Sequence, residues 1–169
     1  MRRVVYSVAM SLDGYIIGPK GESDWILIDP EIDFEAMFAR FDTILLGRRT
    51  YETTRTAGGS MPGVKSYVFS RSLRQVDVRG VTVSDDPVQT VLALKAQPGK
   101  DIWLFGGGVL FRSLLEHRLV DTVGVVIMPV LLGDGVPLLP DTTERTKLRL
   151  VEHHIYDKTG TVSLEYNVV

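Results

Sequence analysis

Three short segments of the chain combine glycine, arginine and hydroxyl side chains in a pattern typical of anion-binding sites. They are Gly47-Arg48-Arg49-Thr50, Ser70-Arg71-Ser72 and Gly106-Gly107-Gly108. Guanidinium groups, hydroxyls and glycine backbone amides all bind phosphate. A cation in the first turn of a helix opposes the helix dipole, so paired arginines there indicate an anion between them and the amides. The segments therefore predict a nucleotide with several phosphates, and tight turns with solvated arginines are the alternative.

Each segment directly follows a short apolar run, at residues 43–46, 66–69 and 102–105. The length and composition of these runs predict strands that are buried on both faces. The apolar residues after the three glycines recur at helical spacing, which predicts a helix there. These residues are Val109, Leu110, Leu114 and Leu115. Ligands of α/β proteins bind beyond the carboxyl ends of the strands, where all three segments would lie.

The other segments complete the prediction of an α/β fold. Residues 4–10 are expected to form a buried first strand, and a loop follows to about residue 29. Asp29 and Pro30 are of the types found at the start of a helix. The apolar face of that helix would carry Phe34, Met37, Phe38 and Phe41.

The second half of the chain predicts further elements of both kinds. They are a loop at 53–63, a short strand at 81–83, a helix from Asp86-Pro87, an apolar run at 121–131, and a β-hairpin of residues 148–157 and 161–169 joined by 158–160. Strands that alternate with helices and end in a strand-rich segment predict a mixed, mostly parallel sheet with an antiparallel C-terminal hairpin.

Composition limits the functions that this chain can have. Its 169 residues are expected to form one domain, residues 1–169, and its net charge of -2 favours neither nucleic acid nor a membrane as partner. The chain has no cysteine, which excludes disulfides and thiolate zinc sites and fits a cytoplasmic location. We expect no metal site. The apolar run at 123–132 and the terminal hairpin could pair subunits, so we expect a homodimer.

Taken in order, the segments resemble the dihydrofolate reductase-like superfamily, and most of all the stand-alone relatives of the riboflavin-biosynthesis reductase domain. The motifs that carry this resemblance are Ser11-Leu12-Asp13-Gly14, Gly21-Glu22-Ser23-Asp24-Trp25-Ile26, Gly47-Arg48-Arg49-Thr50-Tyr51-Glu52, Ser70-Arg71, Gly106-Gly107-Gly108 and Leu132-Gly133-Asp134-Gly135. The resemblance covers nearly the whole chain. It implies a three-layer dihydrofolate reductase-like fold, an NADPH cleft, and direct hydride transfer from the nicotinamide C4 to a small heterocyclic substrate.

The resemblance also implies which residues would meet each ligand. The cofactor-binding residues would be Ala9, Ile17, Trp25, Gly47, Arg48, Arg49, Thr50, Ser70, Arg71, Gly106, Gly107, Gly108, Val109 and Leu110. The substrate-binding residues would be Asp13, Ser23, Phe38 and Phe105. NADPH carries the chemistry in such reductases, so the sequence needs no nucleophile, and it identifies no catalytic residue.

The substrate half of the family pattern is altered in this chain. Riboflavin reductases place a Glu just before the glycine pair, where this chain has Phe105, and an arginine on the first helix, near Phe38. Folate reductases carry a buried carboxylate on that helix, and neither Asp33 nor Glu35 aligns with it. The cofactor-binding half of the family pattern is present in this chain. A non-catalytic nucleotide-binding or regulatory module on the same fold is therefore the alternative to a reductase.

Overall fold

The structure is a computed structural model that describes residues 1–56, 63–74, 76, 78–141 and 144–169. Its strands are β1 (Val4–Ser11), β2 (Tyr15–Ile17), β3 (Phe41–Gly47), β4 (Lys65–Phe69), β5 (Val81–Ser84), β6 (Asp101–Gly106), β7 (Thr122–Met128), β8 (Val136–Pro137), β9 (Leu148–Tyr156) and β10 (Thr161–Val168). Its helices are α1 (Phe34–Ala39), α2 (Arg48–Thr56), α3 (Pro87–Ala96) and α4 (Gly108–Glu116).

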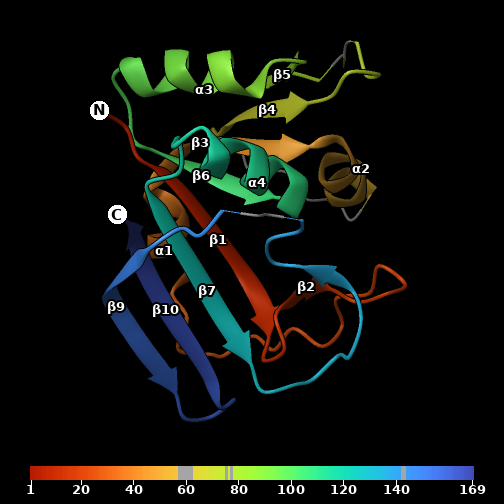
Figure 1. The fold of residues 1–169 in the computed structure, drawn as a ribbon, viewed down its shortest axis with the longest axis vertical. Coiled ribbons are helices and arrows are strands. Elements are labelled where there is room, and N and C mark those ends of the chain that lie inside the picture. The colour runs from red at the N-terminus through yellow and green to blue at the C-terminus, as the bar shows by residue number, and fades with distance from the viewer. Residues whose placement is uncertain (57–62, 75, 77, 142–143) are drawn as a thin grey trace.

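One eight-stranded sheet organises the molecule (Figure 1). Its strands lie in the order β5-β4-β3-β6-β1-β7-β10-β9. Neighbouring strands from β5 to β7 are parallel, whereas β10 is antiparallel to both β7 and β9. The predicted α/β fold, with a mostly parallel sheet and an antiparallel C-terminal hairpin, is confirmed.

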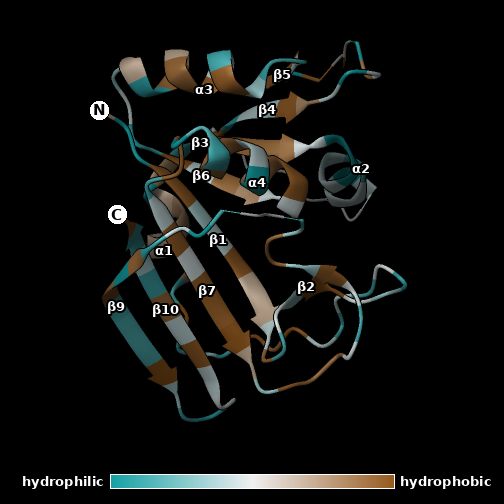
Figure 2. Ribbon diagram, viewed as in Figure 1, coloured by the Kyte–Doolittle hydropathy of each residue, from teal (hydrophilic) through white to brown (hydrophobic). Residues whose placement is uncertain are grey.

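Helices cover the two faces of the sheet and create two separate cores. Leu94 of α3 and Leu114 of α4 are buried on one face, and Tyr51 of α2 is buried on the other. Side chains alternate along a strand, so β1 places Val4 in the first core and Val5 in the second. Burial on both faces explains the continuous apolar runs, which Figure 2 shows as brown central strands.

The first helix begins later than predicted, and Asp29 is not its cap. α1 starts at Phe34, and the carboxylate of Asp33 caps it by accepting a backbone N–H of the first turn at 2.9 Å. Asp29 is buried and accepts a hydrogen bond from Thr159 Oγ1 at 2.8 Å instead. Phe41 also lies outside the helix, because it begins β3. Asp29, whose type suggested a helix cap, thus forms a tertiary hydrogen bond with the terminal hairpin instead.

One further prediction was wrong in part. α2 extends to Thr56, so the start of the predicted loop at 53–63 is helical, and residues 57–62 of that loop lie outside the described residues. The apolar run at 121–131 forms β7, which lies between β1 and β10. Both edges of β7 are therefore occupied within the chain, and β9 is the free edge at this end of the sheet.

A second, two-stranded sheet of β2 and β8 lies beyond the carboxyl end of β1 (Figure 1). Tyr15 of β2 is opposite Pro137 of β8, and Leu138 N donates a hydrogen bond to Gly14 O at 2.9 Å. This small sheet borders the same end of the molecule as α2. Among the helices that the structure describes, none combines the length and the apolar character needed to cross a membrane.

Candidate functional site

The three predicted phosphate-binding segments lie side by side at one edge of the main sheet. They follow β4, β3 and β6, which are consecutive in the sheet although not in the chain. These strands are parallel, so their carboxyl ends meet at the same edge. A Cβ added to Gly47 would lie 3.7 Å from both Gly106 O and Gly107 N. The turns after β3 and β6 are therefore direct neighbours.

The three consecutive glycines have different structural roles. Gly106 has a φ of +134°, which an L side chain rarely adopts. Gly107 is the N-cap residue of α4 and has no side-chain cap. Among the described residues, a Cβ added there would meet only Thr50 Oγ1, at 3.6 Å. Gly108 is buried, and its added Cβ would lie 2.9 Å from Pro140 Cδ. Gly108 thus serves packing and Gly106, also buried, serves an unusual backbone conformation, whereas the half-buried Gly107 leaves its backbone accessible.

The first turn of α4 offers backbone amides at this edge. The first N–H groups of a helix have no partner within the helix and carry the positive end of its dipole. Val109 is 66% exposed, whereas the side chain of Leu110 is buried in the core. Leu110 can therefore meet a ligand only through its backbone.

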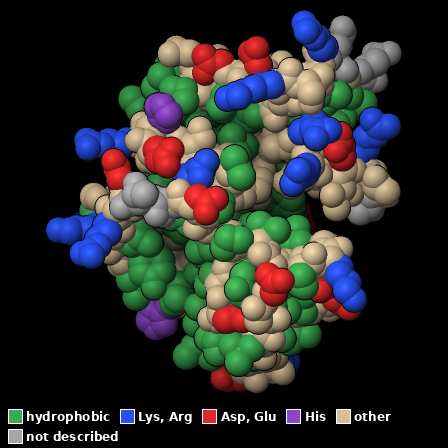
Figure 3. Space-filling model, turned by 45° about the vertical axis from the view of Figure 1, so that its right-hand side comes forward, with side chains coloured by type: hydrophobic (Ala, Val, Ile, Leu, Met, Phe, Trp, Pro, Cys, Tyr) green, Lys and Arg blue, Asp and Glu red, His purple; other side chains and the backbone are tan. Residues whose placement is uncertain are grey.

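Three exposed arginine side chains lie at the same edge, and one of them forms an ion pair with a carboxylate. Arg48 Nη1 lies 3.4 Å from Glu52 Oε1, and both side chains are exposed. Within the described ranges, neither Arg49 nor Arg71 has an ion-pair partner. Lys and Arg side chains gather beside a hollow on the face shown in Figure 3. Exposed guanidinium groups next to open amides form a suitable environment for a phosphate-rich ligand.

The turn after β4 is held by its own first hydroxyl. Ser70 Oγ accepts hydrogen bonds from Leu73 N at 2.9 Å and from Ser72 N at 3.2 Å. These bonds close the turn that presents Arg71 to solvent. The Ser70 hydroxyl keeps its proton available for a ligand or for the neighbouring Ser72 hydroxyl, which lies 3.3 Å away.

The remaining predicted cofactor residues continue the edge beyond β6. β1 is the next strand of the sheet, and Ala9 lies near its carboxyl end. Ile17 is opposite Val136 in the small sheet. Trp25 lies in the loop after β2, where its Nε1 donates a hydrogen bond to Glu22 O at 3.2 Å. All three predicted side chains are half-buried, so each retains exposed surface for a flat ring.

Asp13, predicted to bind substrate, holds two loops together. Its carboxylate accepts hydrogen bonds from Ser11 Oγ at 2.7 Å, Gly133 N at 2.7 Å and Leu132 N at 3.1 Å. The Ser11 and Gly133 bonds stabilise the ionised form and lower the pKa of Asp13 to about 2. The carboxylate joins the end of β1 to the segment before β8 and is a fixed negative charge at neutral pH.

The two aromatic residues predicted to face substrate meet around a tryptophan. The ring of Trp103 lies 5.2 Å from that of Phe38 and 4.9 Å from that of Phe105, measured between centroids. Phe34 extends the group, at 5.9 Å from Phe38. Ser23 is exposed in the loop that precedes this helix. The structure therefore brings Phe38 and Phe105 together as an aromatic surface on the α1 side of the sheet.

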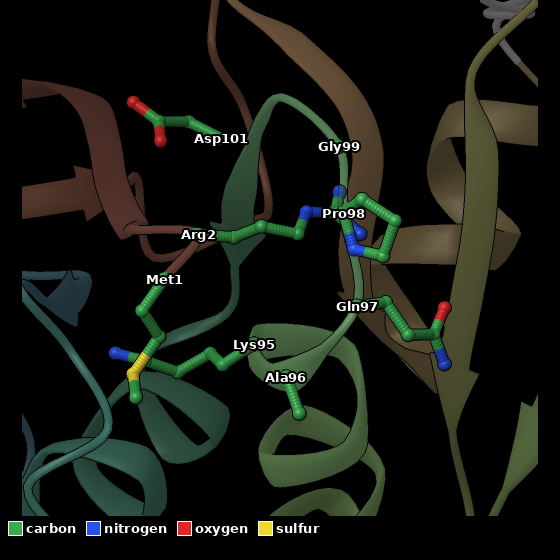
Figure 4. Close-up of a pocket in the computed structure, with 8 residues that line it drawn as sticks. All are labelled: Met1, Arg2, Lys95, Ala96, Gln97, Pro98, Gly99 and Asp101. Carbon is green, nitrogen blue, oxygen red and sulfur yellow. The ribbon is translucent and has the colours of Figure 1, made fainter.

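A second hollow lies at the opposite, amino-end edge of the sheet and has a different character (Figure 4). This cavity of about 450 Å³ is lined by Met1, Arg2, Lys95, Ala96, Gln97, Pro98, Gly99 and Asp101. The Arg2 guanidinium is paired with Asp42, and the Lys95 ammonium is paired with Asp121. Since the fold itself neutralises both cations, this cavity does not match the predicted anion site.

Comparison with known proteins agrees with the geometry. A model of the RibD C-terminal domain matches residues 2–162. The chain belongs to the RibD C-terminal domain family. The uncharacterized protein YyaP of Bacillus subtilis (strain 168) is 34% identical over 179 residues, which cover 98% of this chain and 95% of that protein. The uncharacterized protein YwjB of the same organism is 33% identical and covers 88% of this chain and 89% of its own length.

Solved structures show the same fold at lower identity. A protein from Shewanella sp. PV-4, named as a candidate for riboflavin biosynthesis, has a TM-score of 0.86 at 24% identity and covers 99% of both chains. The dihydrofolate reductase of Enterococcus faecalis, complexed with NADP(H), has a TM-score of 0.73 at 20% identity and covers 98% of this chain and 96% of its own. The deaminase/5-amino-6-(5-phosphoribosylamino)uracil reductase of Thermotoga maritima has a TM-score of 0.74 at 20% identity, over 99% of this chain and 57% of that one.

Membership of the RibD C-terminal domain family and a dihydrofolate reductase-like fold are thus confirmed, and both include reductases. In this RibD C-terminal domain, sequence reasoning missed that Trp103 lies between Phe38 and Phe105, because a tryptophan inside an apolar strand is expected to be a core residue. It also missed the approach of Pro140 to Gly108, which leaves no room for a Cβ on Gly108 and joins segments far apart in the chain. The repeated small and proline residues at 133–140 are the signal that could have indicated a close approach there.

Proposed function

We propose that this protein is an NADPH-dependent reductase that passes a hydride to a small heterocyclic substrate. The observation that carries the proposal is the junction of Gly47-Arg48-Arg49-Thr50, Ser70-Arg71 and Gly106-Gly107-Gly108 at the carboxyl ends of three adjacent strands. Amides, hydroxyls and exposed guanidinium groups meet there. That combination suits a dinucleotide with a diphosphate and an additional phosphate on its ribose.

Different residues at this edge fit different parts of NADPH. The partly exposed backbone at Gly107 and the first turn of α4 would hold the diphosphate, because an uncapped helix start binds anions. Thr50 would donate its hydroxyl to the same group. Arg48 and Arg71 would bind the 2′-phosphate, since guanidinium groups form bidentate pairs with phosphate. The protein should therefore prefer NADPH to NADH.

Beyond the glycines, apolar side chains would orient the two reacting rings. Ala9, Ile17 and Trp25 would face the nicotinamide, which supplies the hydride when bound. Phe38 and Phe105 would stack on a flat substrate ring and exclude water from it, as aromatic surfaces do. Asp13 would act by holding the two loops that border the site rather than by touching substrate. The solved relatives favour a pyrimidine- or pterin-like ring.

A fluorescence titration tests the cofactor assignment. Wild-type protein is expected to bind NADPH at least tenfold more tightly than NADH, and Arg71→Ala should remove most of that difference, since a charged phosphate contact is worth about 1.5–3 kcal/mol. Arg79→Ala is the matched control, because Arg79 is exposed before β5, at the amino-end edge. Equal affinity of the wild-type protein for the two nucleotides would reject the 2′-phosphate assignment.

A non-catalytic nucleotide-binding module is the second candidate, and the aromatic Phe105 at a position where riboflavin reductases carry Glu favours it. Stopped-flow absorbance at the NADPH band, with uracil-type and pterin-type substrates, separates the two. Substrate-dependent oxidation of NADPH would establish the reductase. Tight NADPH binding with no turnover across both substrate types would establish the module.

A further inference from the structure

The two edges of the main sheet are protected to different degrees. β5, at one edge, has four residues, and Asp85 and Asp86 follow it directly. β9, at the other edge, has nine residues and contains neither proline nor lysine. Its Leu148, Leu150, Val151 and Ile155 side chains are 43%, 48%, 47% and 59% exposed. A long apolar edge strand presents unpaired backbone groups and is a template for pairing with another chain.

A β-bulge sorts the side chains of β9 onto two faces. Glu165 of β10 is opposite Glu152, and the next residue, Tyr166, is opposite Leu150. Successive β10 side chains point to opposite faces, so Leu150 and Glu152 also lie on opposite faces, although they are two residues apart. One face of β9 therefore carries Leu148, Leu150, His153 and Ile155, and the other carries Arg149, Glu152, His154 and Tyr156.

The charged face of β9 is incomplete within one copy of the chain. Glu152 is directly opposite another carboxylate, Glu165, and like charges in this position destabilise a sheet. Glu165 Oε2 has Arg40 Nη1 at 3.2 Å, but Glu152 has no ion pair among the residues that the structure describes. Arg149, on the same face, also lacks one within those ranges. β9 thus carries one unmatched anion and one unmatched cation.

We propose that β9 pairs antiparallel with β9 of a second copy about a twofold axis between Leu150 and Val151. In this register Arg149 faces the partner's Glu152 on one side of the sheet, twice by symmetry. Leu148 faces the partner's His153 on the other side, next to Leu150 and Ile155. Arg149 and Glu152 lie on the same face of β9, on either side of the bulge, so the strand is complementary to a second copy of itself. A twofold interface requires such self-complementarity. The pairing also brings a cation to the adjacent Glu152 and Glu165 carboxylates.

Sedimentation velocity of the full chain tests this interface. Wild-type protein should be a dimer at micromolar concentration. Arg149→Glu and Glu152→Arg should each weaken the dimer by about tenfold or more, because each creates two like-charge pairs, and the double exchange should restore it to within about threefold. The matched control exchanges Arg112 and Glu116, an ion pair on α4 between a half-buried and an exposed side chain. A monomer at these concentrations, or a double exchange as weak as the single variants, would overturn the proposal.

A cross-link provides a measurement that does not depend on charge. The chain has no cysteine, so Leu148→Cys/His153→Cys should form a disulfide-linked dimer under mild oxidation, whereas Leu148→Cys alone should not. Linkage by the single variant, or its absence in the double variant, would reject the register. NADPH titration of each variant accompanies both tests. Unchanged nucleotide affinity is expected, so failure of the interface and failure of the proposed function are distinguishable.

Discussion

The arginine side chains at the two ends of the parallel strands differ in burial and in pairing. At the amino end, the side chain of Arg2 is only 6% exposed and is matched by Asp42, Thr43 and the carbonyl of Lys100. At the carboxyl end, the side chain of Arg48 is 44% exposed and Arg71 is also exposed to solvent. Buried charges must be neutralised by the fold, because leaving one unpaired is costly. Arg71 has no ion-pair partner among the described residues and Arg48 has only an exposed pair with Glu52, so both remain available for a ligand. One edge therefore stabilises the fold and the other is suited to binding.

The largest effect on this comparison is expected from Arg2→Met. The substitution leaves the Asp42 carboxylate without its cation and removes the hydrogen bonds to Thr43 and Lys100, so the free energy of unfolding should fall by roughly 2–3 kcal/mol. Asp42 is partly exposed, which keeps the loss below that of a fully buried pair. Urea unfolding measures the loss. The NADPH affinity of the folded fraction should stay at the wild-type value, and a fall in that affinity would contradict the separation of the two edges.

A pair of glycine substitutions sharpens the comparison within the carboxyl edge. Gly108→Ala should lower the free energy of unfolding by about 1–3 kcal/mol, because the new methyl group would lie 2.9 Å from a rigid proline ring. The methyl group of Gly107→Ala would meet Thr50 Oγ1 alone among the described residues, at 3.6 Å, and residue 107 has a φ of -87°. The stability of this variant should therefore stay within about 0.5 kcal/mol of wild type.

Nucleotide affinity should separate the same two variants in the opposite sense. Gly107→Ala adds a methyl group where the backbone would approach the diphosphate, so its NADPH affinity should fall by about tenfold. The affinity of folded Gly108→Ala protein should change less. Calorimetric titration at a temperature where both variants are folded makes this comparison. Equal loss of affinity in both variants would show that the glycines do not have separate roles.

The smallest effect is expected in the acid limb of the stability curve. Burial acts to raise the pKa of Asp42, but the hydrogen bonds from Lys100 N and Thr43 Oγ1 and the Arg2 charge outweigh it and lower that pKa. The carboxylate thus contributes stability that is fully present above its unfolded pKa of 3.8 and is lost as pH falls through the lower folded value. Asp42→Asn should flatten the stability profile below about pH 4. NADPH affinity above pH 5 should not follow this profile.

Sequence patterns located the candidate phosphate-binding segments because each is local. Glycine, arginine and hydroxyl residues directly after an apolar run indicate a strand end wherever the strand lies, and the terminal hairpin is equally local. Asp29 shows the limit of this reasoning. Its type and its neighbour Pro30 suit a helix cap, but Thr159, from the other end of the chain, supplies its partner. Local propensity cannot register a hydrogen bond across that sequence separation.

The sequence by itself determined the alternation of strands and helices and the residue types at three strand ends. Only the tertiary structure decided that β4, β3 and β6 are neighbours, which brings those ends together at one edge of the sheet. It also decided that Asp13 holds two loops and that Trp103 joins Phe38 to Phe105. The physical reason is that strand order depends on which apolar faces pack together. That packing is a property of the whole chain and leaves no local signal at the residues it brings into contact.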